Sequence, residues 1–325
     1  MRASAFHLPV KCHRWLGFCL VTLCVLAAGT VRATEVFSTQ FESSQGYSTN
    51  FDLAGQNGWI KYGSGGNRLI RRDGSQKAYV GLAPPQGSDK SLFLLRPINF
   101  SPITAALPLV KFSTLMSIED STNENYDFFQ WSVYNTLSNR LFTLDFDNNS
   151  TNINYALDST QSYVSTGVKF WPGQVYTLTI NMNFASNRWS ATLDTTVLVT
   201  NLPITTIGLP LTLGDVDAVW ELLDPESPGD NFMLFDNYTI TAEAVPPPPQ
   251  PRLNLLERTG SGRTLLRLTG QAGAAFAIDA STNLVNWTAL MTNRVYDPSF
   301  DFIDNNSAAL TRRLYRARWV PDLPH

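Results

Sequence analysis

Cysteine and histidine are almost missing from this sequence of 325 residues once residues 1–33 are set aside. All three cysteines and two of the three histidines lie within residues 1–33, and the remaining histidine is the last residue, His325. Without these side chains, Cys–His and Ser–His–Asp catalysis lack their base, and zinc or copper sites lack their usual ligands. What remains is the chemistry of carboxylate, hydroxyl, amide and aromatic side chains.

Positive charge is scarce in the same part of the chain. Four of the 24 basic residues but none of the 27 acidic ones lie within residues 1–33, which leaves 20 basic residues and a net charge of −7. Nucleic acids and anionic lipid surfaces bind basic patches, so neither is the expected partner. We also expect no transmembrane segment in the mature chain, because no apolar run after residue 33 reaches the roughly 20 residues that a span needs.

Residues 1–33 have the three zones of a secretory signal peptide. Basic residues precede an apolar stretch over residues 15–28, and Val31 and Ala33 supply small side chains before a cleavage site. The alternative is a membrane anchor, but the apolar stretch is shorter than a span of about 20 residues. We therefore expect a signal peptide over residues 1–33 and a mature chain that is secreted or displayed at the cell surface, with the periplasm as the alternative destination.

Sustained helical periodicity is absent after the leader, and alternating apolar residues are frequent instead. In residues 175–184 (VYTLTINMNF) the apolar side chains fall on one face and Thr and Asn on the other, which is the period of a half-buried strand. A short turn and a second alternating run over residues 189–193 predict a hairpin. Many such runs between Gly, Pro, Asn and Ser turns predict an all-β protein of the sandwich or jelly-roll type.

A proline-rich segment, residues 245–251, divides the mature chain. Five of its seven residues are proline, which favours an extended spacer and excludes a central strand. We expect a large jelly-roll domain over residues 34–244 and a small β-sandwich over residues 252–325. Roughly seven short alternating runs in the small domain are typical of an immunoglobulin-like or fibronectin-type sandwich.

Several longer segments resemble known families. In the large domain, Phe41–Trp59, Trp171–Leu198 and Gly229–Ala242 resemble the concanavalin A-like, or laminin-G-like, jelly roll of secreted bacterial proteins. In the small domain, Phe276–Leu290 and Arg312–Trp319 resemble the C-terminal sandwich modules that often follow such domains. The resemblance implies the fold and a frequent role in binding glycans or surfaces, but it does not imply an activity.

Acidic and amide side chains gather at the end of one predicted strand. Asp145 and Asp147 share a face, and Asn148 starts the following turn. Calcium prefers such oxygen ligands, so one hypothesis is a structural Ca²⁺ at these three residues. The alternative is that they cap the strand and build the turn, because Asp and Asn side chains bond nearby backbone.

Tryptophan and tyrosine are frequent, and exposed aromatic rings stack on sugar rings. Trp131 and Trp189 fall in the apolar phase of their strands and are assigned to the core. Trp59 and Tyr62 lie in a glycine-rich, turn-like stretch over residues 55–66, which makes them the candidates for a ligand-binding surface. The alternative for both is packing inside the sandwich.

Three classes of function stay open. We expect a non-catalytic protein that binds a polysaccharide or a cell-surface glycan. A glycoside hydrolase or polysaccharide lyase with carboxylates on the jelly roll is one alternative, and a structural surface or matrix protein is another. The nearest acidic pattern, residues 220–226 (WELLDPE), places Glu221 and Asp224 on opposite faces of a strand, so no catalytic residue is predicted from it.

Overall fold

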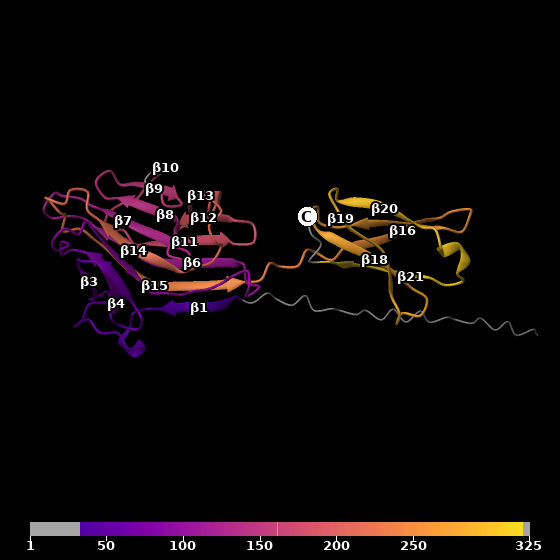
Figure 1. Cartoon of the computed structure of the whole chain (residues 1–325), viewed down its shortest axis with the longest axis horizontal. Coiled ribbons are helices and arrows are strands. Elements are labelled where there is room, and N and C mark those ends of the chain that lie inside the picture. Colours follow the sequence, from indigo (N-terminus) through magenta and orange to yellow (C-terminus); the bar gives the residue numbers. More distant parts are fainter. Residues whose placement is uncertain (1–32, 161, 321–325) are drawn as a thin grey trace, which may run out of the picture. The chain divides into compact units, whose positions relative to one another are not determined.

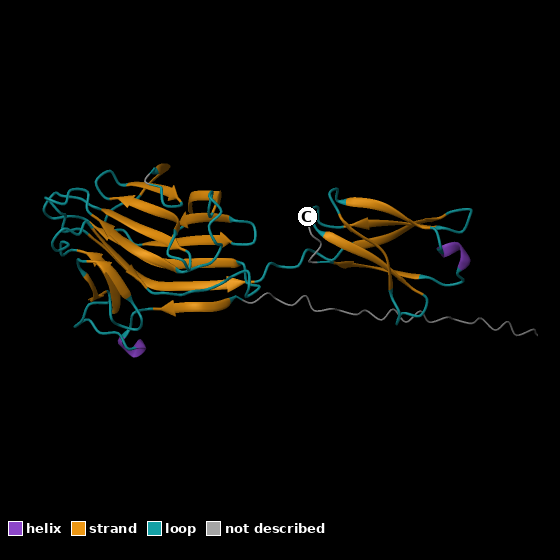
Figure 2. Ribbon diagram, viewed as in Figure 1, coloured by secondary structure: helices purple, strands orange, loops and turns teal. Residues whose placement is uncertain are grey.

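A computed structural model describes residues 33–160 and 162–320 of the chain. The predicted signal peptide lies outside these residues, apart from Ala33. Strands make up nearly all of the regular structure (Figures 1 and 2). The described part contains two short 3₁₀ turns, η1 (Ser43–Gln45) and η2 (Ser307–Ala309), and no helix in it is long and apolar enough to cross a membrane.

The large domain is a sandwich of two antiparallel sheets. The eight-stranded sheet has the order β13-β12-β11-β6-β15-β4-β3, and β1 also pairs with β15. Its strands are β1 (Thr34–Thr39), β3 (Asn67–Arg72), β4 (Ser75–Gly81), β6 (Leu109–Glu119), β11 (Tyr176–Asn183), β12 (Arg188–Leu193), β13 (Thr196–Pro203) and β15 (Phe232–Glu243).

The second sheet of this sandwich has seven strands in the order β10-β9-β8-β7-β14-β5-β2. They are β2 (Ile60–Gly63), β5 (Ser91–Leu95), β7 (Phe128–Tyr134), β8 (Arg140–Asp147), β9 (Asn152–Leu157), β10 (Val164–Lys169) and β14 (Asp215–Glu221). The predicted all-β jelly-roll class of residues 34–244 is therefore confirmed.

Alternation along the strands explains the core between the two sheets. In β11 the side chains of Leu178, Ile180 and Met182 are buried, and β11 pairs with β12 as the predicted hairpin. From the second sheet, β7 contributes Trp131, whose ring packs on that of Phe112 with centroids 5.2 Å apart. The assignment of Trp131 and Trp189 to the core is confirmed, since both are buried.

The small domain is a second sandwich of two three-stranded sheets. One contains β16 (Arg252–Arg258), β17 (Thr264–Thr269) and β20 (Ser299–Asp304); the other contains β18 (Ala275–Ser281), β19 (Thr288–Arg294) and β21 (Leu314–Trp319). Its core is separate from that of the large domain and consists of Leu266, Leu268, Phe276, Ile278 and Val295. The domain thus has six strands where roughly seven were expected, because the alternating residues do not show where one run ends and the next begins.

The proline-rich segment has no strand. β15 ends at Glu243 and β16 begins at Arg252, so residues 245–251 contain no strand, and their role as a spacer stays a prediction.

Candidate functional site

The seven-stranded sheet has a row of register partners whose side chains point away from the core of the sandwich, with exposed members at one end and buried ones in the middle. Directly opposed residues of antiparallel strands point to the same face, so register partners can be followed from strand to strand. The row crosses β2, β5, β14, β7, β8 and β9 through Tyr62, Phe93, Val219, Gln130, Asp145 and Asn154. One edge of this row is aromatic, and its other end is made of amide and carboxyl groups.

Two adjoining hollows lie on this face. One, of about 220 Å³, is lined by Phe128, Gln130, Asp145, Asn154, Tyr163 and Glu221. The other, of about 270 Å³, shares Gln130 and Glu221 with the first and continues along Phe93, Tyr134 and Arg140. We call the two hollows together the sheet trough. It is open to solvent, and it lies across several strands.

A hydrogen-bonded group of side chains forms the floor of the sheet trough. The Gln130 amide nitrogen Nε2 lies 3.3 Å from Asp145 Oδ1, 3.0 Å from Tyr163 Oη and 3.0 Å from Glu221 Oε2. Asn154 Nδ2 donates to the other oxygen of Asp145 at 3.2 Å. We call these five residues the Gln130 cluster. An amide NH₂ has two hydrogens and here faces three oxygens, so these oxygens share its two hydrogens.

Burial favours the protonated, uncharged form of the Asp145 carboxyl in the Gln130 cluster. Asp145 is only 3 % exposed, and burial raises its pKa to about 7. Hydrogen bonds from Asn154 and Gln130 oppose this rise, whereas the nearby charges of Asp147 and Glu221 add to it. The cluster therefore keeps a titratable proton on Asp145 near neutral pH, which is uncommon for a carboxyl group and frequent at functional sites.

One wall of the sheet trough carries its positive charge. Among the described residues that line the two hollows, Arg140 is the one cationic side chain. Its guanidinium donates to the backbone carbonyl of Asp158 at 2.9 Å and to that of Thr160. Arg140 is thus held by backbone acceptors of the neighbouring loop and does not bond the carboxylates of the Gln130 cluster.

A second pair of carboxyl groups lies beside the sheet trough on β14. Asp215 is the register partner of Tyr134, and Asp217 is that of Ser132. Burial raises the pKa of Asp217 well above its usual value, and the charge of the adjacent Asp215 adds to this rise. Burial also raises the pKa of Asp215. Burial therefore favours the uncharged form of both carboxyl groups.

The structure separates the two predicted ligand-binding aromatics. Tyr62 is 63 % exposed and stands at the β2 end of the row described above, as the surface assignment requires. The surface assignment of Trp59 is wrong, because Trp59 is 0 % exposed. Its Nε1 donates to Tyr47 Oη at 3.1 Å, and its ring packs against Tyr238. The glycine-rich stretch folds inward just before β2, and local composition alone does not indicate that direction.

The three proposed calcium ligands have different environments. Both carboxylate oxygens of Asp145 accept amide hydrogens within the Gln130 cluster. Asp147 Oδ1 accepts the backbone N–H of Asn149 at 2.9 Å, as expected for a residue that builds the turn. Asn148 is buried, and its N–H donates to Asp127 O at 3.2 Å. The described residues contain no group of three or more His, Cys, Asp or Glu side chains that would hold a metal, and calcium binding stays a prediction.

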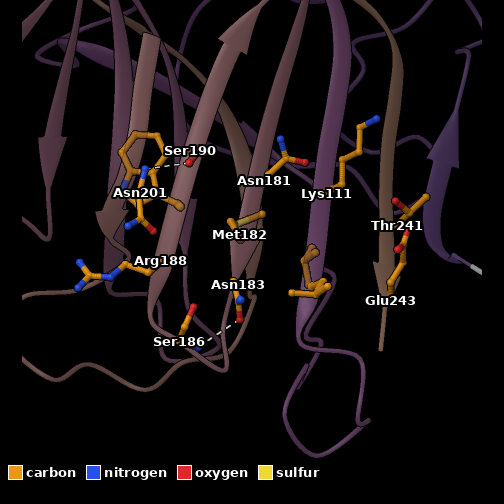
Figure 3. A pocket seen from close by; sticks show the side chains of 13 residues that line it. Lys111, Asn181, Met182, Asn183, Ser186, Arg188, Ser190, Asn201, Thr241 and Glu243 are labelled. Atoms are coloured by element: carbon orange, nitrogen blue, oxygen red, sulfur yellow. Dashed lines mark hydrogen bonds between the residues drawn. The ribbon is translucent and has the colours of Figure 1, made fainter. Parts of the chain in front are cut away.

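A third hollow, of about 350 Å³, lies on the outer face of the eight-stranded sheet (Figure 3). Polar side chains of neighbouring strands surround it, among them the exposed Lys111, Asn181 and Arg188 and the half-buried Thr241. Its aromatic residue, Trp189, is buried and stacks on Phe142, which leaves no ring to face a ligand there. We therefore regard the sheet trough as the candidate site.

Sequence reasoning missed the Gln130 cluster. Asp145 was considered as a metal ligand with its neighbours in the chain, and Glu221 was considered with Asp224. The structure instead joins Asp145 and Glu221 through Gln130, across three adjacent strands. The one available signal was the polar phase of β7, in which Gln130 and Ser132 alternate with apolar residues.

Comparison with known proteins finds only distant structural similarity. No family model and no curated protein matches the chain. Among solved structures, lectin II from Ulex europaeus is 10 % identical with a TM-score of 0.38, and the match covers 59 % of this chain and 95 % of the lectin. An alginate lyase of polysaccharide lyase family 7 is 11 % identical with a TM-score of 0.41 (57 % and 86 % covered). A sialidase is 9 % identical with a TM-score of 0.42, and the match covers 64 % of this chain and 18 % of the sialidase. At these identities the similarity concerns the fold alone.

Proposed function

We propose that this chain is an exported protein that binds a polysaccharide in the sheet trough. The observation that carries the proposal is the row across the outer face of the seven-stranded sheet, with exposed Tyr62 and the partly exposed Phe93 at one edge and the Gln130 cluster at the other end. Aromatic rings offer flat apolar faces to the C–H faces of sugars, and amide and carboxyl groups bond sugar hydroxyls. Export is inferred from the leader sequence.

The extent and charge of the row narrow the class of ligand. Six neighbouring strands at about 4.8 Å spacing span roughly 24 Å, which suits a polymer better than a single small molecule. Carboxyl groups outnumber the single arginine in the trough lining, so a neutral polysaccharide fits better than a polyuronate.

Binding of residues 34–325 to a glycan array and to insoluble polysaccharides tests this proposal. Tyr62→Ala should weaken binding about two- to tenfold, because one stacked ring contributes about 0.5–1.5 kcal/mol. Trp171→Ala is the matched control: Trp171 is 70 % exposed and lies outside both the hollows and the row that contains Tyr62, so its loss should leave the affinity unchanged. Equal effects of the two substitutions, or no binding to any glycan, would contradict the proposed site; the second result would favour a structural surface protein.

A further inference from the structure

The Gln130 cluster brings two carboxyl groups close together on the floor of the sheet trough. Asp145 Oδ1 and Glu221 Oε2 lie 3.3 Å and 3.0 Å from the same nitrogen, Gln130 Nε2. The two oxygens can therefore be no farther apart than these two bonds placed end to end. That limit is shorter than the separation of about 6.5–9.5 Å between the carboxyls of inverting glycosidases and accommodates the about 5–5.5 Å of retaining ones.

The two carboxyl groups have different surroundings. Asp145 is buried and holds its proton to near neutral pH, whereas Glu221 is only partly buried at the end of β14 and faces both hollows. Catalysis of glycosidic-bond cleavage needs this difference, with one carboxylic acid that donates a proton and one carboxylate that attacks or activates water. Tyr163 accepts a hydrogen bond from Gln130 and lines the same hollow, which limits the positions that a ligand can take.

On the basis of the proposed polysaccharide binding, we propose that the sheet trough also hydrolyses its ligand, with Asp145 as the proton donor and Glu221 as the nucleophile. Gln130 is then a positioning residue that holds both carboxyl groups at one glycosidic bond. The substrate class is a neutral polysaccharide, and the geometry predicts that the configuration at the anomeric carbon is retained.

The reaction takes two balanced steps. The Asp145 carboxylic acid gives its proton to the glycosidic oxygen while Glu221 attacks the anomeric carbon, so that the C–O bond breaks, an alcohol leaves and a glycosyl ester forms on Glu221. Asp145, now a carboxylate, takes a proton from water as that water attacks the anomeric carbon. The ester bond breaks, the Glu221 carboxylate and the Asp145 acid are restored, and the sugar is released with a new reducing end.

Hydrolysis fits the site better than elimination by a lyase. A lyase removes a proton beside the carboxylate of a uronate, and it needs positive charge to neutralise that carboxylate. The one arginine of the trough lining bonds backbone carbonyls of its own loop, and the remaining charged groups of the lining are carboxyls.

The release of reducing ends by residues 34–325 from cellulose, xylan, β-1,3-glucan, mannan and chitin tests this inference. We expect release from a polysaccharide that the chain binds, with the retained anomer as the first product in NMR spectra. Asp145→Asn and Glu221→Gln should lower the rate at least 100-fold and leave binding nearly unchanged. Glu226→Gln, at an exposed acid that lines neither hollow, should have wild-type activity.

A second measurement identifies the nucleophile directly in the wild-type chain. A 2-deoxy-2-fluoro glycosyl fluoride of the hydrolysed sugar should label the wild-type chain, and peptide mass spectrometry should place the label on Glu221. Azide should also restore turnover to Glu221→Ala by forming a glycosyl azide.

The outcomes separate the two proposals. Binding without release of reducing ends from any bound polysaccharide would overturn the hydrolysis and leave the binding proposal intact. An inverted first product, or a label on another residue, would overturn the assigned roles. Absence of binding would overturn the proposed function itself.

Discussion

Burial of single side chains decides between stability and binding in the large domain. Trp59 is 0 % exposed and donates a hydrogen bond to Tyr47, so we expect Trp59→Ala to lower the free energy of unfolding by about 3–5 kcal/mol. Trp171→Ala removes an exposed ring and should change it by less than about 0.5 kcal/mol. Urea unfolding of both variants measures the difference. Similar stability of the two variants would show that Trp59 is not a core residue.

The protonation of Asp145 should make the free energy of unfolding depend on pH. Its pKa is raised by burial to about 7 from the usual 3.8, so the folded state holds a proton that the unfolded state releases at lower pH. The stability due to the protonated carboxyl is complete below pH 3.8 and is lost as the pH rises to about 7. The groups that face Asp145 are Asp147, Glu221, Gln130, Asn154 and the phenol of Tyr163, none of them cationic.

Asp145→Asn removes this titration. Relative to the wild type, the variant should gain about 2–4 kcal/mol at pH 8 and almost nothing at pH 4. Chemical unfolding at the two pH values measures the gain, and Glu226→Gln, at an exposed carboxyl, serves as the control. A gain that is equal at both pH values would show that the proton is not held by Asp145. Such a gain in stability on removal of a buried acid is typical of residues kept for function.

At the scale of the element, β2 is an edge strand whose position depends on a glycine. Gly63 has φ +80°, and a Cβ there would lie 2.1 Å from Ser91 O on the paired strand β5. Gly63→Ala must therefore push β2 away from β5 and move Tyr62 with it. We expect a loss of about 1–3 kcal/mol in unfolding free energy together with weaker glycan binding.

Gly74→Ala is the matched control for this element. Gly74 also has a positive φ, +87°, but nothing lies within 4 Å of the place that a Cβ would occupy. The variant should lose only about 1 kcal/mol, from backbone strain, and keep wild-type affinity. Unaltered binding by a folded Gly63→Ala variant would mean that β2 does not contribute to the site.

At the scale of the whole molecule, the two sandwiches have separate hydrophobic cores joined by a segment without strands. Each core should therefore melt by itself, and calorimetry of residues 34–325 should show two transitions. Residues 34–244 expressed alone should keep one transition and bind glycans with unchanged affinity. If residues 34–325 showed a single transition and residues 34–244 alone showed none, the two domains would not be independent.

Much of the fold was open to prediction from local patterns. The alternation in residues 175–184 specified both the strand and its buried face, and five prolines in seven residues indicated a segment without strands. Such signals are local, because side chains in a strand alternate between faces with a period of two. Where alternation is missing, as around Trp59, local composition predicted an exposed side chain, but the side chain is buried.

By itself, the sequence determined the class of fold and the chemistry that remains without cysteine and histidine. Only the tertiary structure decided which oxygen-bearing groups meet. Gln130 and Glu221 are 91 residues apart in the chain and Gln130 and Asp145 are 15 apart, yet all three lie on neighbouring strands. Their approach depends on strand order and cross-strand register, which arise from the packing of the whole sandwich and leave no pattern in any short stretch of sequence.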